Sequence, residues 1–331
     1  MALDTILRLN QTGQNPDPAR EAERLQASLE MATHADTAGF GTINLEEHHC
    51  TDAGWMGSPL VMAGLVAART RHIRIRVCAL LVTLYDPIRL AEEIALLDQA
   101  SDGRIFYVAG QGYRPLEYHA LDKDWDTRGA RADHVLDTLQ KAWTGEPFDY
   151  RGQTVRVRPV PLTRPHPLLY YGGMSAAAAQ RAARFGLPFF PPAPMPGLAS
   201  IYAKECERLG TTGHVADPGP DSTLLFIDES PEQAWADLGH HFLREASEYG
   251  SWAREGVDRP YATATLTVEE LRAQKRYEIL TPEECRERIS RQGKEYRPIL
   301  HPLCGGVPID RAWRCIRLYT DKVLGPLGLT R

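Results

Sequence analysis

Short apolar runs alternate with longer amphipathic segments through most of the chain. The short runs are rich in Ile, Val, Leu and aromatic residues, as is typical of strands buried on both faces of a sheet. The longer segments repeat apolar residues with helical spacing, and Gly or Pro stands at many of their ends. This pattern predicts strands over residues 5–10, 42–45, 73–82, 105–109, 168–171, 187–190, 224–227 and 298–303. It predicts helices over residues 19–38, 59–69, 87–100, 127–143, 176–185, 197–209, 231–249 and 310–323.

These elements make about eight strand-then-helix units. That number favours α/β architecture with a closed parallel sheet, a single (β/α)8 TIM barrel, over an open doubly wound sheet. No change in composition marks a second domain, so residues 1–331 are predicted to form one domain. Two stretches, Phe148–Pro167 and Ser251–Pro282, are longer than barrel connections need. We expect them to be long loop insertions at the C-terminal face that shape a pocket.

Length, charge and cysteine spacing narrow the class of protein. The 331 residues are 43% hydrophobic and carry a formal net charge of −5, with a pI of about 6.1. Nothing in this balance demands the basic face with which proteins bind nucleic acid or anionic membranes. No apolar run approaches the roughly 20 residues that span a bilayer, and the N-terminus lacks a signal-peptide pattern. The six cysteines are scattered without a Cys-x-x-Cys pair, so we expect a cytoplasmic protein with reduced thiols.

Two carboxylates and two histidines directly follow the second predicted strand. In a barrel, reacting groups lie where strands end and the next loops begin. Histidine titrates near neutral pH and a carboxylate can orient it, so Glu47, His48 and His49 are candidates for acid–base chemistry. A metal site is a competing interpretation, but the spacing suggests no third His or carboxylate ligand. The pattern alone leaves a polar loop with surface histidines as an equal alternative.

Glycines and a tyrosine, Gly110–Tyr113, end the fourth predicted strand. Glycine there lets a ligand approach the backbone, although a plain tight turn has the same pattern. The glycines do not extend to a dinucleotide fingerprint, because Pro115 follows and no helix is predicted to begin there. Tyr113 and Trp55 are predicted to bind substrate, with core packing as the alternative for both.

The segment Gly172–Ala176 joins the fifth predicted strand to its helix. Its Gly173, Met174 and Ser175 would supply backbone N–H groups and a hydroxyl at the positive end of a helix dipole, which together suit a phosphate. Arg128, at the start of the neighbouring predicted helix, could add a charge-assisted hydrogen bond. An ordinary N-cap at Ser175 and a solvated Arg128 are the alternative interpretations.

A series of motifs runs in order through nearly the whole chain. They are Leu45–His49, Gly57–Pro59, Asp86–Glu93, Leu96–Arg104, Gly172–Ser175, Gly186–Pro188, Leu280–Cys285 and Pro298–Leu318. No single motif decides the matter, but in this order the chain resembles the bacterial luciferase-like monooxygenase family. The resemblance implies a reduced flavin at the C-terminal face of the barrel. It also implies reaction of that flavin with O2 to a C4a-peroxide, which then oxygenates a small organic substrate.

The resemblance assigns roles to individual residues. It gives His48 the acid–base role, with His49 as its supporting neighbour. It places Cys78 and Ala79 where the family often has a non-prolyl cis peptide against the flavin ring. The expected cofactor site comprises Glu47, Cys78, Ala79, Gln111, Arg128, Gly173, Met174 and Ser175.

Three positions depart from the luciferases. Gly110 replaces a reactive cysteine, Gln111 an arginine, and Ala178 a hydroxyl residue. Light emission is therefore not implied. The two histidines after Glu47 favour reduced flavin mononucleotide (FMN) over the deazaflavin F420.

The expected partners are a small organic substrate, O2 and a separate flavin reductase, because no nicotinamide-binding fingerprint occurs in the chain. A homodimer is expected from the family. Two other functions stay open, namely an F420-dependent hydride-transfer oxidoreductase and a non-catalytic flavin-binding protein. The identity of the substrate is not predicted.

Overall fold

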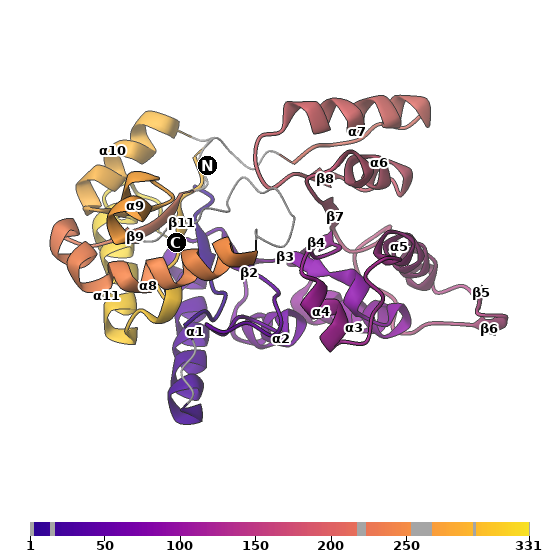
Figure 1. The fold of residues 1–331 in the computed structure, drawn as a ribbon, viewed down its shortest axis with the longest axis horizontal. Helices are drawn as coiled ribbons and strands as arrows, with labels where there is room; N and C mark the ends of the chain where they lie inside the picture. The colour runs from indigo at the N-terminus through magenta and orange to yellow at the C-terminus, as the bar shows by residue number, and fades with distance from the viewer. Residues whose placement is uncertain (1–2, 14–16, 217–222, 253–266, 294–295, 331) are drawn as a thin grey trace. The chain divides into compact units, whose positions relative to one another are not determined.

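Parallel strands alternate with helices in the computed structural model of the chain (Figure 1). The structure describes residues 3–13, 17–216, 223–252, 267–293 and 296–330. The chain divides into two compact units. The first unit comprises Met1–Gly57, Arg69–Ile73 and Gly219–Arg331, and the second comprises Ser58–Ala68 and Arg74–Pro218.

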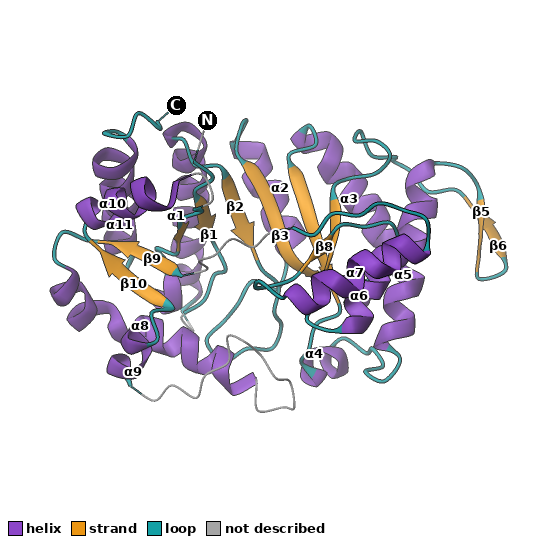
Figure 2. Cartoon of the chain, turned by 90° about the horizontal axis from the view of Figure 1, so that it is seen from above, coloured by secondary structure: helices purple, strands orange, loops and turns teal. Residues whose placement is uncertain are grey.

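The described part of the first unit is built on parallel strands in the order β10-β9-β11-β1-β2. Figure 2 shows β9 and β10 as neighbouring arrows that point the same way. The strands are β1 (Ile6–Arg8), β2 (Thr42–Leu45), β9 (Leu224–Ile227), β10 (Tyr277–Leu280) and β11 (Ile299–Leu300). The α-helices are α1 (Pro18–Ala38), α8 (Pro231–Ser251), α9 (Val268–Ala273), α10 (Pro282–Gln292) and α11 (Ile309–Tyr319).

The second unit has parallel strands in the order β3-β4-β7-β8 and a separate antiparallel hairpin. The parallel strands are β3 (Arg74–Leu81), β4 (Ile105–Gly110), β7 (Leu169–Gly172) and β8 (Phe189–Phe190), and the hairpin is β5 (Phe148–Tyr150) with β6 (Gln153–Val155). The α-helices are α2 (Pro59–Arg69), α3 (Pro87–Ser101), α4 (Pro115–Ala120), α5 (Arg128–Thr144), α6 (Ala176–Arg184) and α7 (Pro196–Arg208).

Local sequence explains where these helices begin and end. Asp86 accepts the N–H groups of Ile88 and Arg89 at the start of α3, with Pro87 in the first helical position. Thr281 and Glu284 form a reciprocal capping box at the start of α10. These caps satisfy N–H groups that have no partner inside the helix, so the predicted boundaries lie close to the observed ones.

Three expectations about connections are corrected. A short helix, α4, does begin at Pro115, since proline suits the first turn, where its missing N–H costs nothing. Phe148–Pro167 contains the β5–β6 hairpin and joins the end of α5 to the start of β7. Barrel sites lie at the opposite ends of the strands, so this stretch does not shape a pocket there. Ser251–Pro282 is not structureless, because α9 and β10 lie in it, while residues 253–266 lie outside the described residues.

Apolar side chains of the strands make the buried core of each unit. In the first unit, Leu7, Ile43 and Leu300 are fully buried. In the second unit, Val77 and Ala109 are fully buried in the same way. No helix among the described residues is both long enough and apolar enough to cross a membrane.

Candidate active site

In the first unit, the loop after β2 folds back on the end of β1. The backbone N–H of His48 donates to the carbonyl oxygen of Met56 at 3.0 Å, and the N–H of Met56 donates to the carbonyl oxygen of Asn10 at 2.9 Å. At the base of the loop, Arg8 Nη2 donates to Glu46 Oε2 at 2.8 Å. These bonds hold the Glu47-His48-His49 segment at the carboxyl ends of two parallel strands, where the sequence predicts it.

Glu47 pairs with His49. Its Oε1 lies 3.0 Å from His49 Nε2, and the Glu47 side chain is 1% exposed against 19% for His49. A buried carboxylate orients an imidazole and stabilises its protonated form. Because the described contact joins Glu47 to His49, Glu47 acts first on the histidine that sequence analysis treats as the supporting neighbour.

His48 is surrounded by aromatic rings. Its ring centroid lies 4.6 Å from that of Trp252, 5.4 Å from that of Trp55 and 6.2 Å from that of Tyr249. His48 is itself buried, and Trp55 and Trp252 pack against each other at 5.0 Å. The structure thus brings Trp55, Tyr249 and Trp252 to His48, and the predicted role of Trp55 in substrate binding stays a prediction.

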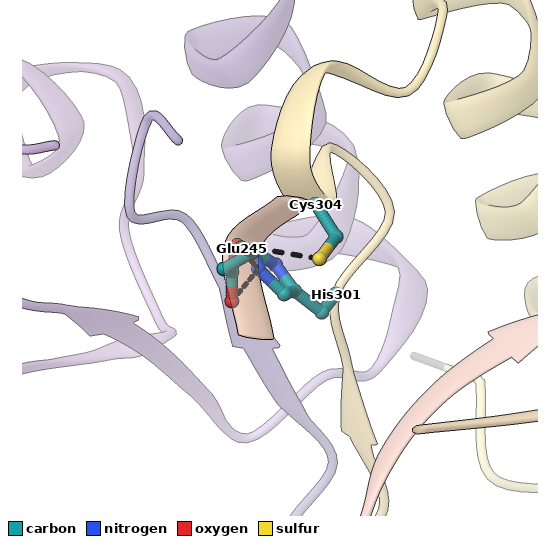
Figure 3. Close-up of side chains that lie close together, drawn as sticks. All are labelled: Glu245, His301 and Cys304. Carbon is teal, nitrogen blue, oxygen red and sulfur yellow. Dashed lines mark hydrogen bonds and ion pairs between the residues drawn. The ribbon is translucent and has the colours of Figure 1, made fainter. Parts of the chain in front are cut away.

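A buried polar network lies beside this loop, at the ends of β1 and β11. His301 Nε2 lies 2.8 Å from Glu245 Oε2, and Cys304 Sγ donates to the same oxygen at 3.2 Å (Figure 3). Arg8 Nη1 donates to the other Glu245 oxygen at 3.1 Å. Burial alone would raise the pKa of Glu245, but His301 and Arg8 hold that pKa well below its usual range. Burial, and then the Glu245 carboxylate, raise the pKa of the Cys304 thiol.

Glu245, His301 and Cys304 each offer an atom that could bind a cation, because these three atoms lie within 4.8 Å of one another. The Glu245 carboxylate is, however, already paired with the Arg8 guanidinium and accepts a hydrogen bond from the Thr12 hydroxyl. A cation would have to displace these donors next to a fixed positive charge. The contacts therefore favour a charge-compensated hydrogen-bond network over a metal site.

Local sequence does not predict this network, although the position of Glu245 gives one signal. Glu245 follows Trp235, Leu238 and Phe242 along the buried stripe of α8. A carboxylate on an apolar stripe needs a partner. Its partners come from segments 32 to 237 residues away in sequence, so no local pattern identifies them.

In the second unit, the turn between β7 and α6 forms a cradle. A Cβ on Gly173 would lie 2.5 Å from the Ala178 Cβ, so only glycine fits there without a shift. Ser175 Oγ accepts the N–H of Ala178 at 3.2 Å as the N-cap of the nine-residue α6. Ser175 and the first two alanines of α6 are exposed, so a ligand can reach the first turn. Glycine, a hydroxyl and helix N–H groups are donors that fit a phosphate.

Two side chains hold the first turn of α5, Gln111 from the segment after β4 and Arg181 from α6. Gln111 Nε2 donates to the carbonyl oxygen of Arg128 at 3.4 Å, and Arg181 Nη2 donates to that of Gly129 at 3.2 Å. The Arg128 guanidinium stacks on Trp125 at 3.9 Å from the ring centroid, and it is half-buried. Arg181, which is not among the predicted site residues, also pairs with Asp133 at 2.6 Å.

A family model described as luciferase-like monooxygenase matches residues 6–295. This match covers most of the chain and includes segments of both units. The chain belongs to this family. The resemblance inferred from the ordered motifs is thereby confirmed.

Individual family members share the fold and part of the sequence. An FMNH(2)-dependent dimethylsulfone monooxygenase of Pseudomonas putida is 30% identical over 174 residues, 50% of this chain and 45% of that protein. The monooxygenase RslO1 of Streptomyces bottropensis has a TM-score of 0.72 at 22% identity, over 98% of this chain and 99% of its own. An F420-dependent secondary alcohol dehydrogenase has a TM-score of 0.65 at 16% identity, over 98% of both chains.

The sequence matches and the structural matches cover different shares of the related proteins. The chain spans about half the length of several curated relatives that it matches. The two solved structures are matched over nearly their whole length, and they confirm the predicted α/β barrel fold class.

Within this luciferase-like chain, the departure at Gly110 has a steric reason. A Cβ on Gly110 would lie 3.0 Å from the Ala79 Cβ, so a side chain as large as cysteine would need the neighbouring strand to shift. The Cys78–Ala79 peptide bond is cis, as the resemblance implies. Ala79 packs against a buried cluster that includes Leu81 and Tyr118. Tyr113 is half-buried after β4, and its role in substrate binding stays a prediction.

Proposed function

We propose that the chain is a two-component monooxygenase. It receives reduced FMN from a separate reductase and uses O2 to oxygenate a small organic substrate. The observation that carries the cofactor assignment is the Gly173–Ser175 cradle at the start of α6, which fits a phosphate such as that of FMN. The FMNH(2)-dependent relative supports the same cofactor. Because the family match includes segments of both units, we propose that residues 1–331 act as one catalytic domain.

The second unit would hold the cofactor. Gly173, Met174 and Ser175 would bind the phosphate through backbone N–H groups and a hydroxyl, and Arg128 would add a positive charge. Gln111 replaces an arginine of the luciferases, but Arg181 lies in the same cluster and fixes the first turn of α5. Cys78 and Ala79 would lie along the flavin ring.

The first unit would supply proton transfer. Reduced FMN, when bound, would supply the electrons that activate O2. His48 would move a proton to or from the reacting group, within a ring of aromatic side chains that excludes water. His49 would be kept in one orientation by Glu47. Trp55 Nε1 is buried and finds no acceptor among the described residues, so it would donate to a polar atom of the substrate.

Cofactor and oxygen dependence test the proposal. Purified chain is mixed with reduced FMN or reduced F420 and a panel of sulfones, aldehydes, ketones and aromatic compounds, with and without O2. We expect substrate-dependent oxygen uptake with reduced FMN and no turnover with F420. Oxygen-independent turnover with F420 would instead establish a hydride-transfer enzyme. Tight FMN binding without turnover of any compound would favour a flavin-binding protein.

We also propose that the chain forms a homodimer through α2 and α3. Val61 and Leu65, one turn apart on α2, are 65% and 42% exposed, and Leu96 on α3 is 60% exposed. Gly64 lies close to the Leu97 side chain, so the two helices approach each other. Apolar side chains gathered on adjoining helices indicate a surface that another protein covers.

A further inference from the structure

One face of the last two turns of α8 carries four side chains that all contact the site in the first unit. They are Glu245, Glu248, Tyr249 and Trp252, the last of which directly follows the helix. Their spacing of three, four and seven residues places them on one side of a helix. The proposed function uses only the aromatic rings among these residues, as the wall around His48. The sequence predicts residues 245–249 as the end of a helix and places Trp252 in the loop of residues 251–282.

Glu245 anchors this face to the strand ends. Its carboxylate is 1% exposed and accepts hydrogen bonds from His301, after β11, and from Arg8, at the end of β1. Arg8 also bonds Glu46, the first residue of the His48 loop. A buried, fully paired carboxylate tolerates little displacement, because each lost partner leaves an uncompensated charge.

Glu248 holds the far side of the same loop. Its Oε1 accepts the backbone N–H of Asp52 at 2.7 Å, and its Oε2 accepts the N–H of Ala53 at 3.1 Å. Hydrogen bonds from backbone N–H groups to a carboxylate are stronger than those between neutral groups. Two carboxylates of one helix thus hold the loop of residues 46–57, Glu245 at the start of the loop through Arg8 and Glu248 at its middle.

Between these anchors, Tyr249 and Trp252 bring their rings against His48. Trp252 lies 4.6 Å from the His48 ring at an interplanar angle of 52°, and Tyr249 lies 6.2 Å away at 76°. Trp55, from the loop itself, closes the third side at 5.4 Å. Aromatic rings in such contact restrict the orientation of the imidazole.

We propose that this face of α8 is the element that positions His48. Glu245 and Glu248 fix the loop, and Trp252 and Tyr249 fix the imidazole. The four are positioning residues. The proposal rests on the proposed function only in taking His48 as the acid–base group, because the contacts themselves involve no cofactor.

The test compares Glu248→Ala, Glu248→Gln and Trp252→Leu in the full chain by NMR of the histidine rings. The His48 signal is assigned by its loss in His48→Gln. We expect Trp252→Leu and Glu248→Ala to move the His48 Hε1 resonance toward that of an exposed histidine, because the aromatic rings and the loop no longer fix the imidazole. Glu248→Gln keeps an oxygen that accepts one N–H, so its spectrum should stay close to that of the wild type.

Turnover gives the second readout. We expect Glu248→Ala to lower kcat by about 10- to 100-fold with KM within about threefold, since a misplaced group slows the chemical step more than it weakens binding. Glu248→Gln should retain most of kcat. Glu232→Ala is the matched control, because Glu232 lies at the exposed start of α8 and pairs only on the surface with Arg272.

An unchanged His48 resonance in both Trp252→Leu and Glu248→Ala, with the fold intact by circular dichroism, would overturn the proposal. So would an equal shift in Glu232→Ala. The NMR result needs no flavin or substrate. If the chain proves not to be a monooxygenase, the positioning of His48 is still tested independently.

Discussion

Glu245 is a buried carboxylate whose contribution to stability depends on pH. Its pKa in the folded protein is held well below the unfolded value of about 4.3. A lowered carboxylate pKa stabilises the fold fully above the unfolded pKa, and the contribution is lost as pH falls toward the folded pKa. The ion pair with Arg8 therefore weakens only in acid.

Glu245→Gln should reveal this dependence. Removing one partner of a buried ion pair costs about 3 kcal/mol, so we expect a loss of this size in the free energy of unfolding at pH 7. Urea denaturation at pH 7 and at about pH 3 measures it, and the difference from the wild type should shrink at the lower pH. An equal difference at both pH values would show that the charge of Glu245 is not what stabilises the fold.

At the scale of elements, α6 combines two roles in one residue. Ser175 caps the helix and, in our proposal, also binds the FMN phosphate. Riboflavin lacks that phosphate, so comparing the two flavins separates the roles.

Two substitutions at Ser175 distinguish these roles. Ser175→Ala should weaken FMN binding about tenfold, the equivalent of about 1.4 kcal/mol, and leave riboflavin binding unchanged. Ser175→Asp keeps a capping side chain but repels phosphate, so FMN binding should fall further while thermal stability is retained. Calorimetric titration measures both affinities. Equal losses for FMN and riboflavin would place the phosphate elsewhere.

Elements were predictable where local sequence decides them. The buried runs at residues 42–45 and 224–227 and the Asp86-Pro87 helix start give boundaries that the structure reproduces. The short helix at Pro115 was not predicted, because its six residues are too few to show a periodic pattern. The contacts of α8 were not predicted for a different reason. The residues that α8 contacts are up to 237 residues away in sequence, and only folding brings them together.

The candidate site was predictable to a similar degree. The Glu47-His48-His49 segment and the Gly173–Ser175 turn can be recognised from the sequence, because their residue types suit a site and they directly follow predicted strands. The pairing of Glu47 with His49, by contrast, depends on how the loop closes, which the sequence does not show. Arg181 escaped because it lies inside a helix, where an arginine is usually solvated.

At the scale of the whole molecule, the apolar surface on α2 and α3 predicts the oligomeric state. Light scattering after gel filtration should give twice the chain mass of 37.0 kDa. Val61→Glu with Leu65→Glu should yield monomers, because the free energy needed to bury two unpaired carboxylates exceeds the free energy gained on association. Leu162→Glu, at another exposed leucine, should leave the mass unchanged. A wild-type monomer would refute the proposed interface.

The fate of molecular oxygen tests the central claim most directly. The chain is incubated under ¹⁸O2 in ordinary water with FMN, a flavin reductase, its reduced nicotinamide and a substrate that supports oxygen uptake. Mass spectrometry then measures the mass of the product. We predict one ¹⁸O atom per product molecule, and about 10²-fold less labelled product in His48→Ala than in the control His119→Ala. Product that carries no ¹⁸O would contradict the monooxygenase assignment.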